Sequence, residues 1–596
     1  MRACRLLVLP LVVSALGAAA TAPAQAAAKP KQATAVGTNG AVVSVDADAT
    51  QVGLRVLRAG GNAVDAAVAT AAALGVTEPF SAGIGGGGYF VHYDAATGRV
   101  ETIDGRETGP ASLREDSFTD GQGTALGFQE ARVSGLSVGV PGTLKTWQKA
   151  LTRWGSTSLQ EALAPAEQLA RRGFVVDQTF ADQVAGNTAA FSAFSSTAKL
   201  YLPGGAPPAV GSRFRNPDLA DTYAEIGATD GRSFYRGAVA QDLVRAVQRP
   251  PVQPSSWPTP IRPGGMTLAD LAGYRALARP ATQVSYRGLD VYGVPPSTSG
   301  GTTVGEALNI LGTRDLSSAD RGLALHDYLE ASALAFADRN RYVGDPDFVD
   351  VPRRELLSPA FAAERACLIS ATSTLPRPVA PGRPDGTYSC APPATAPVKA
   401  QQEGLSTTNL TVADRWGNVA EYTLTIEQTG GSGIVVPGRG FLLNNELTDF
   451  SFTPTQGTAP DPNLPAAGKR PRSSIAPTVV LREDKPFLAV GSPGGATIIT
   501  TVLQILIDRV DLGLSLPQAI ADPRLSERNG ASTQAEPAFL QTPEAADLRS
   551  RGHTLSETPE IGAATGIEFL GGGRLLAAAE PVRRGGGSAA VLNPEP

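Results

Sequence analysis

Histidine and cysteine are scarce in this chain of 596 residues, which contains three of each. The histidines, His92, His326 and His553, are far apart, and none lies in the motif-dense region that begins near residue 400. A histidine-based catalytic triad or a multi-histidine metal site is therefore not supported. The cysteines lack the CxxC spacing of zinc sites. The sequence predicts neither a metal nor a cofactor.

An excess of charge of one sign is also absent. The chain has 51 Lys and Arg against 56 Asp and Glu, interspersed, for a formal net charge of −5. This balance gives no footprint for nucleic acid and no polybasic patch for a membrane surface. The glycine clusters lack a Walker lysine and a dinucleotide fingerprint, which argues against a nucleotide-binding protein.

Long apolar runs are missing except near the start of the chain. Arg2 and Arg5 precede an apolar run at 6–16, and small residues continue to Ala24-Gln25-Ala26. This pattern is typical of a cleaved secretory signal, and the run is too short for a stable anchor. We therefore expect residues 1–26 to be a signal peptide and the protein to be secreted or periplasmic, without a membrane anchor.

Removal of that peptide would leave two cysteines, Cys367 and Cys390, in a stretch rich in proline and glycine. In an oxidising compartment such a pair is a disulfide candidate.

Hydrophobic periodicity predicts a mixed α and β protein. Residues 36–100 predict a strand, a helix at 49–59, a second helix capped near Asn62, and another strand. Residues 140–175 and 266–345 are interpreted as mainly helical. After residue 407 the pattern changes to short alternating strands, glycine-rich turns and one helix near 500–508. This change in sequence pattern near residue 400 is consistent with a boundary between two domains or two chains.

Two adjacent threonines, Thr407 and Thr408, begin a predicted hairpin in "EGLSTTNLTVADRWGN", residues 403–418. Their β-branched side chains suit a strand, which is the simplest explanation. A threonine at a chain terminus can also be a nucleophile, because its own α-amine, with a pKa of about 7.7 to 8.0, accepts the hydroxyl proton. Thr407 could act in this way only after the Ser406–Thr407 bond is cut. Its hydroxyl could make that cut by attacking the Ser406 carbonyl to form an ester that water hydrolyses.

Two glycine clusters could supply backbone hydrogen-bond donors. In "GSPGGAT", 491–497, Gly494 and Gly495 directly precede an apolar helix, where N–H groups can face an oxyanion. In "GIGGGGYF", 83–90, the glycines either form a similar loop or allow close approach of neighbouring backbone.

Polar side chains in three further motifs suit a zwitterionic substrate. Arg106 in "IDGRET" follows a predicted strand and could hold a carboxylate. Glu446 and Asp449 in "LLNNELTDFSF" could meet an ammonium group, and "KRPRSSIAPT" supplies Ser473 and Ser474. Each alone is more often a solvated surface group, so only the set is informative.

The order of these motifs resembles the γ-glutamyltransferase family, also called γ-glutamyltranspeptidases or glutathione hydrolases, of the N-terminal nucleophile hydrolase superfamily. The similar segments include "SVDADATQVGLRVLRAGGNAVDAAVA", "GVPGTLKTW", "PPSTSGG", "FADRNRYVGDPDF" and "STTNLTVADRWGNVAEYTLT". The resemblance implies an α+β fold, a four-layer αββα sandwich. It also implies autoproteolysis into a large subunit, 27–406, and a small subunit, 407–596, which form the sandwich jointly.

The resemblance assigns roles to the catalytic candidates. Thr407 matches the nucleophile, which takes a γ-glutamyl group from glutathione or a related compound as an ester and passes it to water or to an amino acid or peptide amine. Thr425 matches the threonine that supports the nucleophile's amine, and Gly494 and Gly495 match the oxyanion donors.

The resemblance also assigns the substrate contacts. Arg106, helped by Ser473 and Ser474, matches the group that binds the substrate α-carboxylate. Glu446 and Asp449 match the partners of its α-amino group.

The sequence departs from the family pattern at positions that bear on specificity. Glu427 stands where glutathione-acting members commonly carry asparagine, and Asn409 where bacterial members often carry histidine. Glu427 adds negative charge beside the ammonium site, which either tightens amine recognition or admits another acyl group. Residues 451–468 are shorter than in members with a lid, so we expect an open cleft and hydrolysis over transfer.

These departures leave alternatives open. One is a glutaryl-type (cephalosporin) acylase, and another is an enzyme that trims poly-γ-glutamate. A third, of a different class, is an uncleaved relative that only binds γ-glutamyl peptides.

Overall fold

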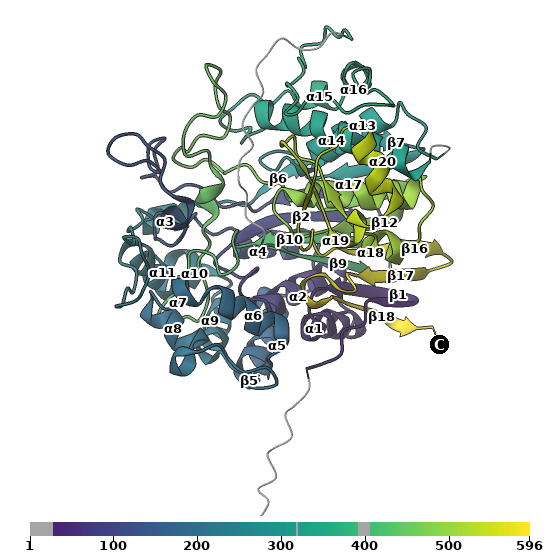
Figure 1. Ribbon diagram of the computed structural model, residues 1–596. Helices are drawn as coiled ribbons and strands as arrows, with labels where there is room; N and C mark the ends of the chain where they lie inside the picture. Colours follow the sequence, from purple (N-terminus) through teal and green to yellow (C-terminus); the bar gives the residue numbers. More distant parts are fainter. Residues whose placement is uncertain (1–27, 318–319, 391–405, 596) are drawn as a thin grey trace, which may run out of the picture.

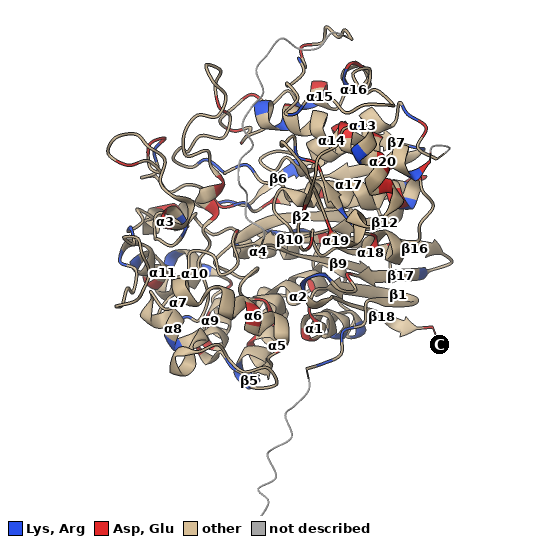
Figure 2. Ribbon diagram, in the orientation of Figure 1, with Lys and Arg blue, Asp and Glu red and all other residues tan. Residues whose placement is uncertain are grey.

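The computed structural model describes residues 28–317, 320–390 and 406–595 (Figure 1). The predicted signal peptide, residues 1–26, and residues 391–405, which directly precede Ser406, lie outside these ranges. Cys367 and Cys390 form a disulfide with Cα atoms 5.9 Å apart. Basic and acidic side chains are interspersed over the ribbon (Figure 2). Within the described ranges, no helix combines the length and apolar character needed to cross a bilayer.

The threonine hairpin forms as predicted. Strands β9 (Thr408–Asp414) and β10 (Val419–Thr425) are antiparallel, with Leu410 opposite Tyr422, and every residue of both is buried. The Asp414 carboxylate accepts hydrogen bonds from the N–H groups of Trp416 and Asn418, which closes the turn. Thr407 therefore lies directly before a central, buried strand.

The main sheet has 13 strands, and β1 divides it into two packed layers. The later part of β1 (Thr34–Ser44) pairs with β9 and β18, whereas its first residues pair with β17. The strand order is β6-β3-β2-β10-β9-β1-β17-β16-β12-β11-β8-β7. Strands β10 and β12, and β9 and β16, contact face to face. The other strands of this sheet are β2 (Gly87–Asp94), β3 (Arg99–Asp104), β6 (Leu277–Pro280), β7 (Thr282–Tyr286), β8 (Leu289–Gly293), β11 (Thr478–Arg482), β12 (Lys485–Gly491), β16 (Thr565–Gly571), β17 (Arg574–Ala579) and β18 (Ser588–Pro594).

Helices cover both outer faces (Figure 1). On one side lie α1 (Ala47–Arg58), α2 (Ala63–Thr77) and α4 (Thr143–Trp154), and on the other α13 (Gly300–Leu311), α14 (Arg321–Tyr342), α17 (Thr497–Val510) and α18 (Leu516–Ala521). Each helical layer closes its own hydrophobic core against one sheet. The predicted four-layer αββα sandwich is confirmed.

A helical lobe extends from the first helical layer (Figure 1). It comprises α5 (Leu159–Arg172), α6 (Gln178–Gly186), α7 (Thr188–Phe191), α8 (Ser195–Tyr201), α9 (Pro217–Ala228), α10 (Arg232–Arg236) and α11 (Ala238–Gln248), with the short strands β4 (Phe174–Val175) and β5 (Arg213–Phe214). The remaining elements are α3 (Phe128–Arg132), α12 (Leu268–Gly273), α15 (Arg353–Leu356), α16 (Pro359–Ala366), β13 (Leu525–Ser526), β14 (Thr533–Ala535), β15 (Leu555–Glu557), α19 (Pro537–Leu540) and α20 (Pro543–Ser550).

Local sequence signals set the start of α2. Asn62 caps this helix, accepting from the N–H groups of Val64 and Asp65, while the Asp65 carboxylate accepts from the Asn62 N–H in a capping box. All 15 residues of the helix are buried, because its small side chains allow helices α1, α4 and α5 and strands β9 and β10 to pack closely around it.

Two secondary-structure predictions need correction. The segment 266–345 contains helices α12, α13 and α14 as predicted, but the prediction missed strands β6, β7 and β8 within it, and β7 shows a clear in-out alternation of burial. Past residue 407 the described chain has α18, α19 and α20 besides α17. These three helices have four to eight residues, too few to give a clear helical period.

Candidate active site

One small cavity between the sheets collects the site residues predicted from sequence, except Gly494 and Ser406. Its volume is about 20 Å³, close to that of one or two water molecules. Its lining consists of Arg106, Thr407, Thr425, Glu427, Glu446, Asp449, Ser473, Ser474, Ile475, Gly495 and Ile498. Gly494 lines the neighbouring cleft, and Ser406 directly precedes Thr407 in the chain.

Thr407 lies against the carbonyl group that it would have to attack. In the uncut chain its hydroxyl donates to the Ser406 carbonyl oxygen at 2.6 Å. The Thr425 hydroxyl donates to the same oxygen at 3.0 Å and lies 3.3 Å from the Thr407 hydroxyl. Thr425 is oriented in turn by the N–H of Glu427, which donates to its Oγ1 at 2.8 Å. Two hydroxyl groups thus converge on the Ser406–Thr407 peptide bond.

The glycines at 83–90 allow close backbone approach rather than form an open loop. A Cβ atom on Gly86 would lie 2.0 Å from the carbonyl oxygen of Thr425, and one on Gly85 would lie 2.0 Å from that of Leu442. Either contact is far shorter than real Cβ atoms allow. Gly86 therefore allows the backbone of Thr425 to approach closely, and Gly85 allows the same for Leu442.

Gly494 and Gly495 lead from β12 into α17 and have positive φ angles of 135° and 58°. Such angles are readily adopted by glycine, which has no side chain to clash with the backbone. The loop reaches both spaces of the site, because Gly495 lines the small cavity and Gly494 the adjacent cleft.

Arg106 is buried at the centre of the cavity, 1% exposed, and pairs with two carboxylates. Its guanidinium donates to Glu446 through Nη1 and to Asp449 through Nη2. It also donates to the Pro471 and Arg472 carbonyl oxygens, each at 3.2 Å. Burial is the largest single influence and disfavours the charged form, but the neighbouring charges, first that of Asp449, together outweigh burial and raise the pKa of Arg106. The group is therefore a fixed cation.

Glu427 joins these carboxylates at the cavity wall. It is 4% exposed, has a positive φ of 78°, and its carboxylate accepts a hydrogen bond from the Asn445 side chain. A non-glycine residue with such an angle is uncommon and is often found at a functional site. Three acidic residues thus line the same small cavity as Arg106.

Ser473 and Ser474 are held by an arginine that the sequence did not single out. Arg339 on α14 donates to the Ser474 hydroxyl and to the Ser299 hydroxyl, each at 2.7 Å. Ser299 in turn donates through its hydroxyl to the Ser473 carbonyl oxygen at 2.7 Å. Arg339 lies in "FADRNRYVGDPDF", but no local spacing points to its role.

A polar cleft of about 670 Å³ opens beside the small cavity. Among the described residues that line it, none is aliphatic or aromatic. They are Arg132, Thr179, Asp182, Gln183, Gly186, Asn187, Gln428, Thr429, Gly494, Thr497, Gln534, Thr558, Glu560, Gly562, Arg584 and Gly585. Arg584 connects this cleft with Thr407, because its Nη1 donates to the Thr407 carbonyl oxygen at 2.6 Å. Sequence analysis missed Arg584, which lies 177 positions from Thr407.

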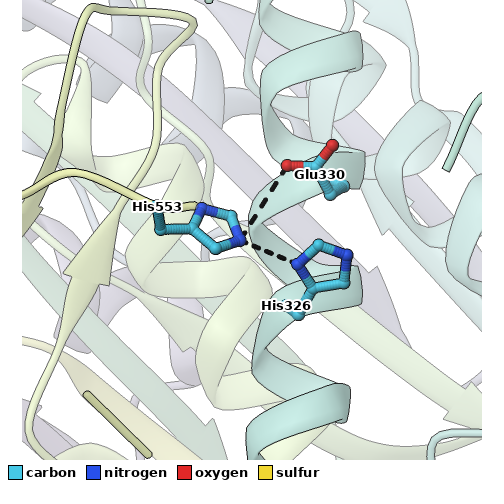
Figure 3. Close-up of side chains that lie close together, drawn as sticks. All are labelled: His326, Glu330 and His553. Carbon is cyan, nitrogen blue, oxygen red and sulfur yellow. Dashed lines mark hydrogen bonds and ion pairs between the residues drawn. The ribbon is translucent and has the colours of Figure 1, made fainter. Parts of the chain in front are cut away.

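His326, Glu330 and His553 form a buried cluster (Figure 3), and none of the three lines the small cavity. His326 donates through Nε2 to the Ser370 carbonyl oxygen at 2.7 Å, so its Nδ1 accepts from Nε2 of His553 at 2.8 Å. Glu330 already accepts from Arg377 and from the Thr374 hydroxyl. The cluster is therefore a hydrogen-bonded link between α14 and the segment after α20.

This link predicts a loss of stability in acid. Burial, followed by the proximity of His326, Arg377 and Arg551, lowers the pKa of His553 to about 3. The unfolded chain, with a histidine pKa of about 6.5, then binds this proton more readily. Stability from His553 is complete above about pH 6.5 and falls by about 1.4 kcal/mol per pH unit below it.

Glutamine has no titratable ring. We therefore expect the melting temperature of His553→Gln to fall less between pH 7 and pH 5 than that of the unchanged protein. Thermal unfolding monitored by fluorescence at several pH values measures this difference. Arg549→Gln, an exposed change on α20, is the matched control. An equal fall in melting temperature between pH 7 and pH 5 for His553→Gln and the unchanged protein would contradict this role of His553.

A threonine before a central strand of an αββα sandwich, beside a glycine loop and a buried arginine, defines the class of N-terminal nucleophile hydrolases. Comparisons with known proteins then give the family. The family model described as Gamma-glutamyltranspeptidase matches residues 49–590. The chain belongs to the γ-glutamyltranspeptidase family and is an enzyme of that family.

Individual relatives include two named activities. The chain is 38% identical over 530 residues to a glutathione hydrolase proenzyme of Bacillus subtilis, covering 88% of this chain and 86% of the relative. It is 34% identical over 559 residues to an acylase ACY 1 proenzyme of a Pseudomonas species, covering 91% and 92%. A cephalosporin acylase from Bacillus halodurans has a similar structure, with a TM-score of 0.79, 29% identity, and coverage of 96% and 99%.

Proposed function

We propose that this chain is an exported, self-processing γ-glutamyl amide hydrolase and transferase that acts on glutathione and related γ-glutamyl compounds. The observation that carries the proposal is a single cavity that joins Thr407 to Arg106, Glu446 and Asp449. A nucleophile and a recognition site for a zwitterionic head group lie together there.

The reaction follows from these residues. Once the Ser406–Thr407 bond is cut, the Thr407 amine becomes free and takes the proton of its own hydroxyl. The hydroxyl oxygen then attacks the γ-carbonyl of the substrate, and the N–H groups of Gly494 and Gly495 stabilise the oxyanion. The amine returns the proton to the leaving nitrogen. Water, or an amino acid or peptide amine, then releases the γ-glutamyl group from the ester.

The charges of the acyl pocket favour γ-glutamyl over glutaryl groups. An α-carboxylate that binds Arg106 must displace Glu446 and Asp449 from the guanidinium. A substrate ammonium compensates these carboxylates, whereas a glutaryl group has no cation and would leave them facing a like charge. Glu427 adds a third negative charge to the same wall.

The adjoining cleft suits a polar leaving group or acceptor. It supplies amide, hydroxyl, arginine and carboxylate groups, and it is open enough to admit water. These features favour short peptides on the leaving side and make water the main acceptor.

Substrate preference is therefore expected to be large. A matched pair, γ-glutamyl-p-nitroanilide and glutaryl-p-nitroanilide, differs only in the α-amino group. We expect kcat/KM to be about 100-fold or more higher for the γ-glutamyl compound, because charged hydrogen bonds are worth about 1.5 to 3 kcal/mol each and a buried charge would otherwise remain unpaired.

Glu427→Gln should reduce the preference in kcat/KM for the γ-glutamyl over the glutaryl compound, by raising KM for the γ-glutamyl compound. Intact-mass measurement and N-terminal sequencing establish in the same preparation whether the smaller chain begins at Thr407. Equal or greater activity on the glutaryl compound would assign the chain to the acylases instead. An uncut chain with no activity would favour the alternative of an uncleaved relative that only binds γ-glutamyl peptides.

A further inference from the structure

The Ser406–Thr407 bond is contacted on its Thr407 side by the guanidinium of Arg584 and on its Ser406 side by Ser81, which Arg584 also contacts. Nη1 of Arg584 donates to the Thr407 carbonyl oxygen at 2.6 Å, and Nη2 donates to the Ser81 hydroxyl at 2.8 Å. The Ser81 hydroxyl lies 2.8 Å from the Ser406 hydroxyl. Two linked side chains that contact the residues on either side of a peptide bond restrict the rotations on each side of it.

The hydrogen bonds that link Arg584, Ser81 and Ser406 can all be donated in the same order. Ser81 accepts from Arg584, so its own proton is available for Ser406. Ser406 then donates to the Phe80 carbonyl oxygen, at 3.3 Å. Every hydroxyl proton has an acceptor, and Ser81 and Ser406 are both buried. Satisfied buried networks of this kind are rigid.

The loop that carries Arg584 is constrained to present it. Arg584 has φ of 54° and ψ of 35°, the left-handed conformation that non-glycine residues rarely adopt. The preceding residue, Arg583, anchors the loop through ion pairs with Glu536 at 2.5 Å and Glu580 at 2.9 Å. A backbone held in a costly conformation beside a reactive bond is a recurrent feature of functional sites.

We propose that Arg584 and Ser81 brace the Ser406–Thr407 peptide for self-cleavage, Arg584 holding Thr407 and Ser81 holding Ser406. The inference rests on the self-processing part of the proposed function. Both are positioning residues, because neither supplies the nucleophile nor contacts the scissile carbonyl oxygen in the structure. That oxygen accepts from the hydroxyls of Thr407 and Thr425.

The cleavage step balances with groups already present and one water. The Thr407 oxygen bonds to the Ser406 carbonyl carbon, the peptide C–N bond breaks, and the hydroxyl proton ends on the Thr407 nitrogen. Water then hydrolyses the ester, giving a Ser406 carboxylate and restoring the Thr407 hydroxyl. The brace acts before the first bond forms, by keeping the hydroxyl and the carbonyl in contact.

The test follows cleavage of the full-length chain made in a cell-free translation mixture, on denaturing gels over time. We expect Arg584→Gly to cut about 100-fold more slowly, the cost of losing an aligned attack. Ser81→Ala should cut about 2- to 10-fold more slowly, as for one neutral hydrogen bond. Arg574→Gln, which changes an exposed arginine paired with Glu595 on the surface, should cut at the unchanged rate.

A second readout separates positioning from structural support. Glycine accepts the left-handed angle at 584 without strain, so free guanidinium ion, at concentrations far below those that denature proteins, should partly restore cutting in Arg584→Gly but not in Ser81→Ala. Melting temperatures are compared in uncut chains that also carry Thr407→Ala, where Arg584→Gly should change little.

The outcomes distinguish the two proposals. Normal cutting by Arg584→Gly beside a normally cut parent chain would overturn the brace alone. Slow cutting that guanidinium does not rescue, or that comes with a large fall in melting temperature, would assign Arg584 a structural role and also overturn it. A parent chain that stays uncut would overturn self-processing itself, and the brace with it.

Discussion

Replacing Thr407 with alanine is expected to give a single uncut chain without γ-glutamyl amidase activity. The change removes the hydroxyl that lies 2.6 Å from the Ser406 carbonyl oxygen, and alanine has no other side-chain group that could act as the nucleophile. Loss of a nucleophile in a comparable acyl-transfer site costs on the order of 10⁶ in kcat, so activity should fall to background. Gel analysis and release of p-nitroaniline measure the two effects.

Thr408→Ala is the matched control for this prediction. Thr408 is the adjacent threonine, equally buried at the start of β9, but it does not line the cavity. In the structure its hydroxyl has no hydrogen-bond partner among the described residues, so its removal costs little. We expect normal cutting and activity. Thr407→Ser, which keeps a hydroxyl, should cut slowly and retain part of the activity. Two normal chains from Thr407→Ala would refute self-cleavage by this residue.

Replacing Arg106 should have the second largest effect, through substrate binding. Arg106→Lys keeps a positive charge but loses the planar pair of donors, so we expect KM to rise about 10- to 100-fold with a smaller change in kcat. Steady-state kinetics with γ-glutamyl-p-nitroanilide separates the two constants. Arg99→Lys, an exposed change at the start of β3, the strand that ends two residues before Arg106, is the control. An unchanged KM for Arg106→Lys would argue against the carboxylate-binding role.

Arg106→Ala tests the same pocket by charge. It would leave the buried carboxylates of Glu446 and Asp449 without their cation, which costs about 3 to 5 kcal/mol of stability. Adding Glu446→Gln and Asp449→Asn should restore the melting temperature without restoring activity. If the triple variant regained activity, the three side chains would serve stability and not recognition.

Much of the site was predictable because short, continuous motifs carry it. Arg106 and Gly495 lie in separate motifs and Thr407 and Thr425 share a third, and the fold brings all four to one cavity. Their roles as nucleophile, oxyanion donor and carboxylate ligand stay predictions until the variants are measured. Arg584 and Ser81 were missed because single residues in unremarkable segments have no spacing or period that marks them.

The sequence by itself determined the elements whose signals are local. The capping box at Asn62 and the alternation of Thr408–Asp414 and Val419–Thr425 depend on neighbours within a few residues, so both were predictable. Only the tertiary structure decided which distant groups meet. Arg584 reaches Thr407 across 177 positions, because β17 pairs with β1 and the loop after it returns to the cleft. Side-chain contacts between elements exist only once the two sheets pack, and no local pattern encodes them.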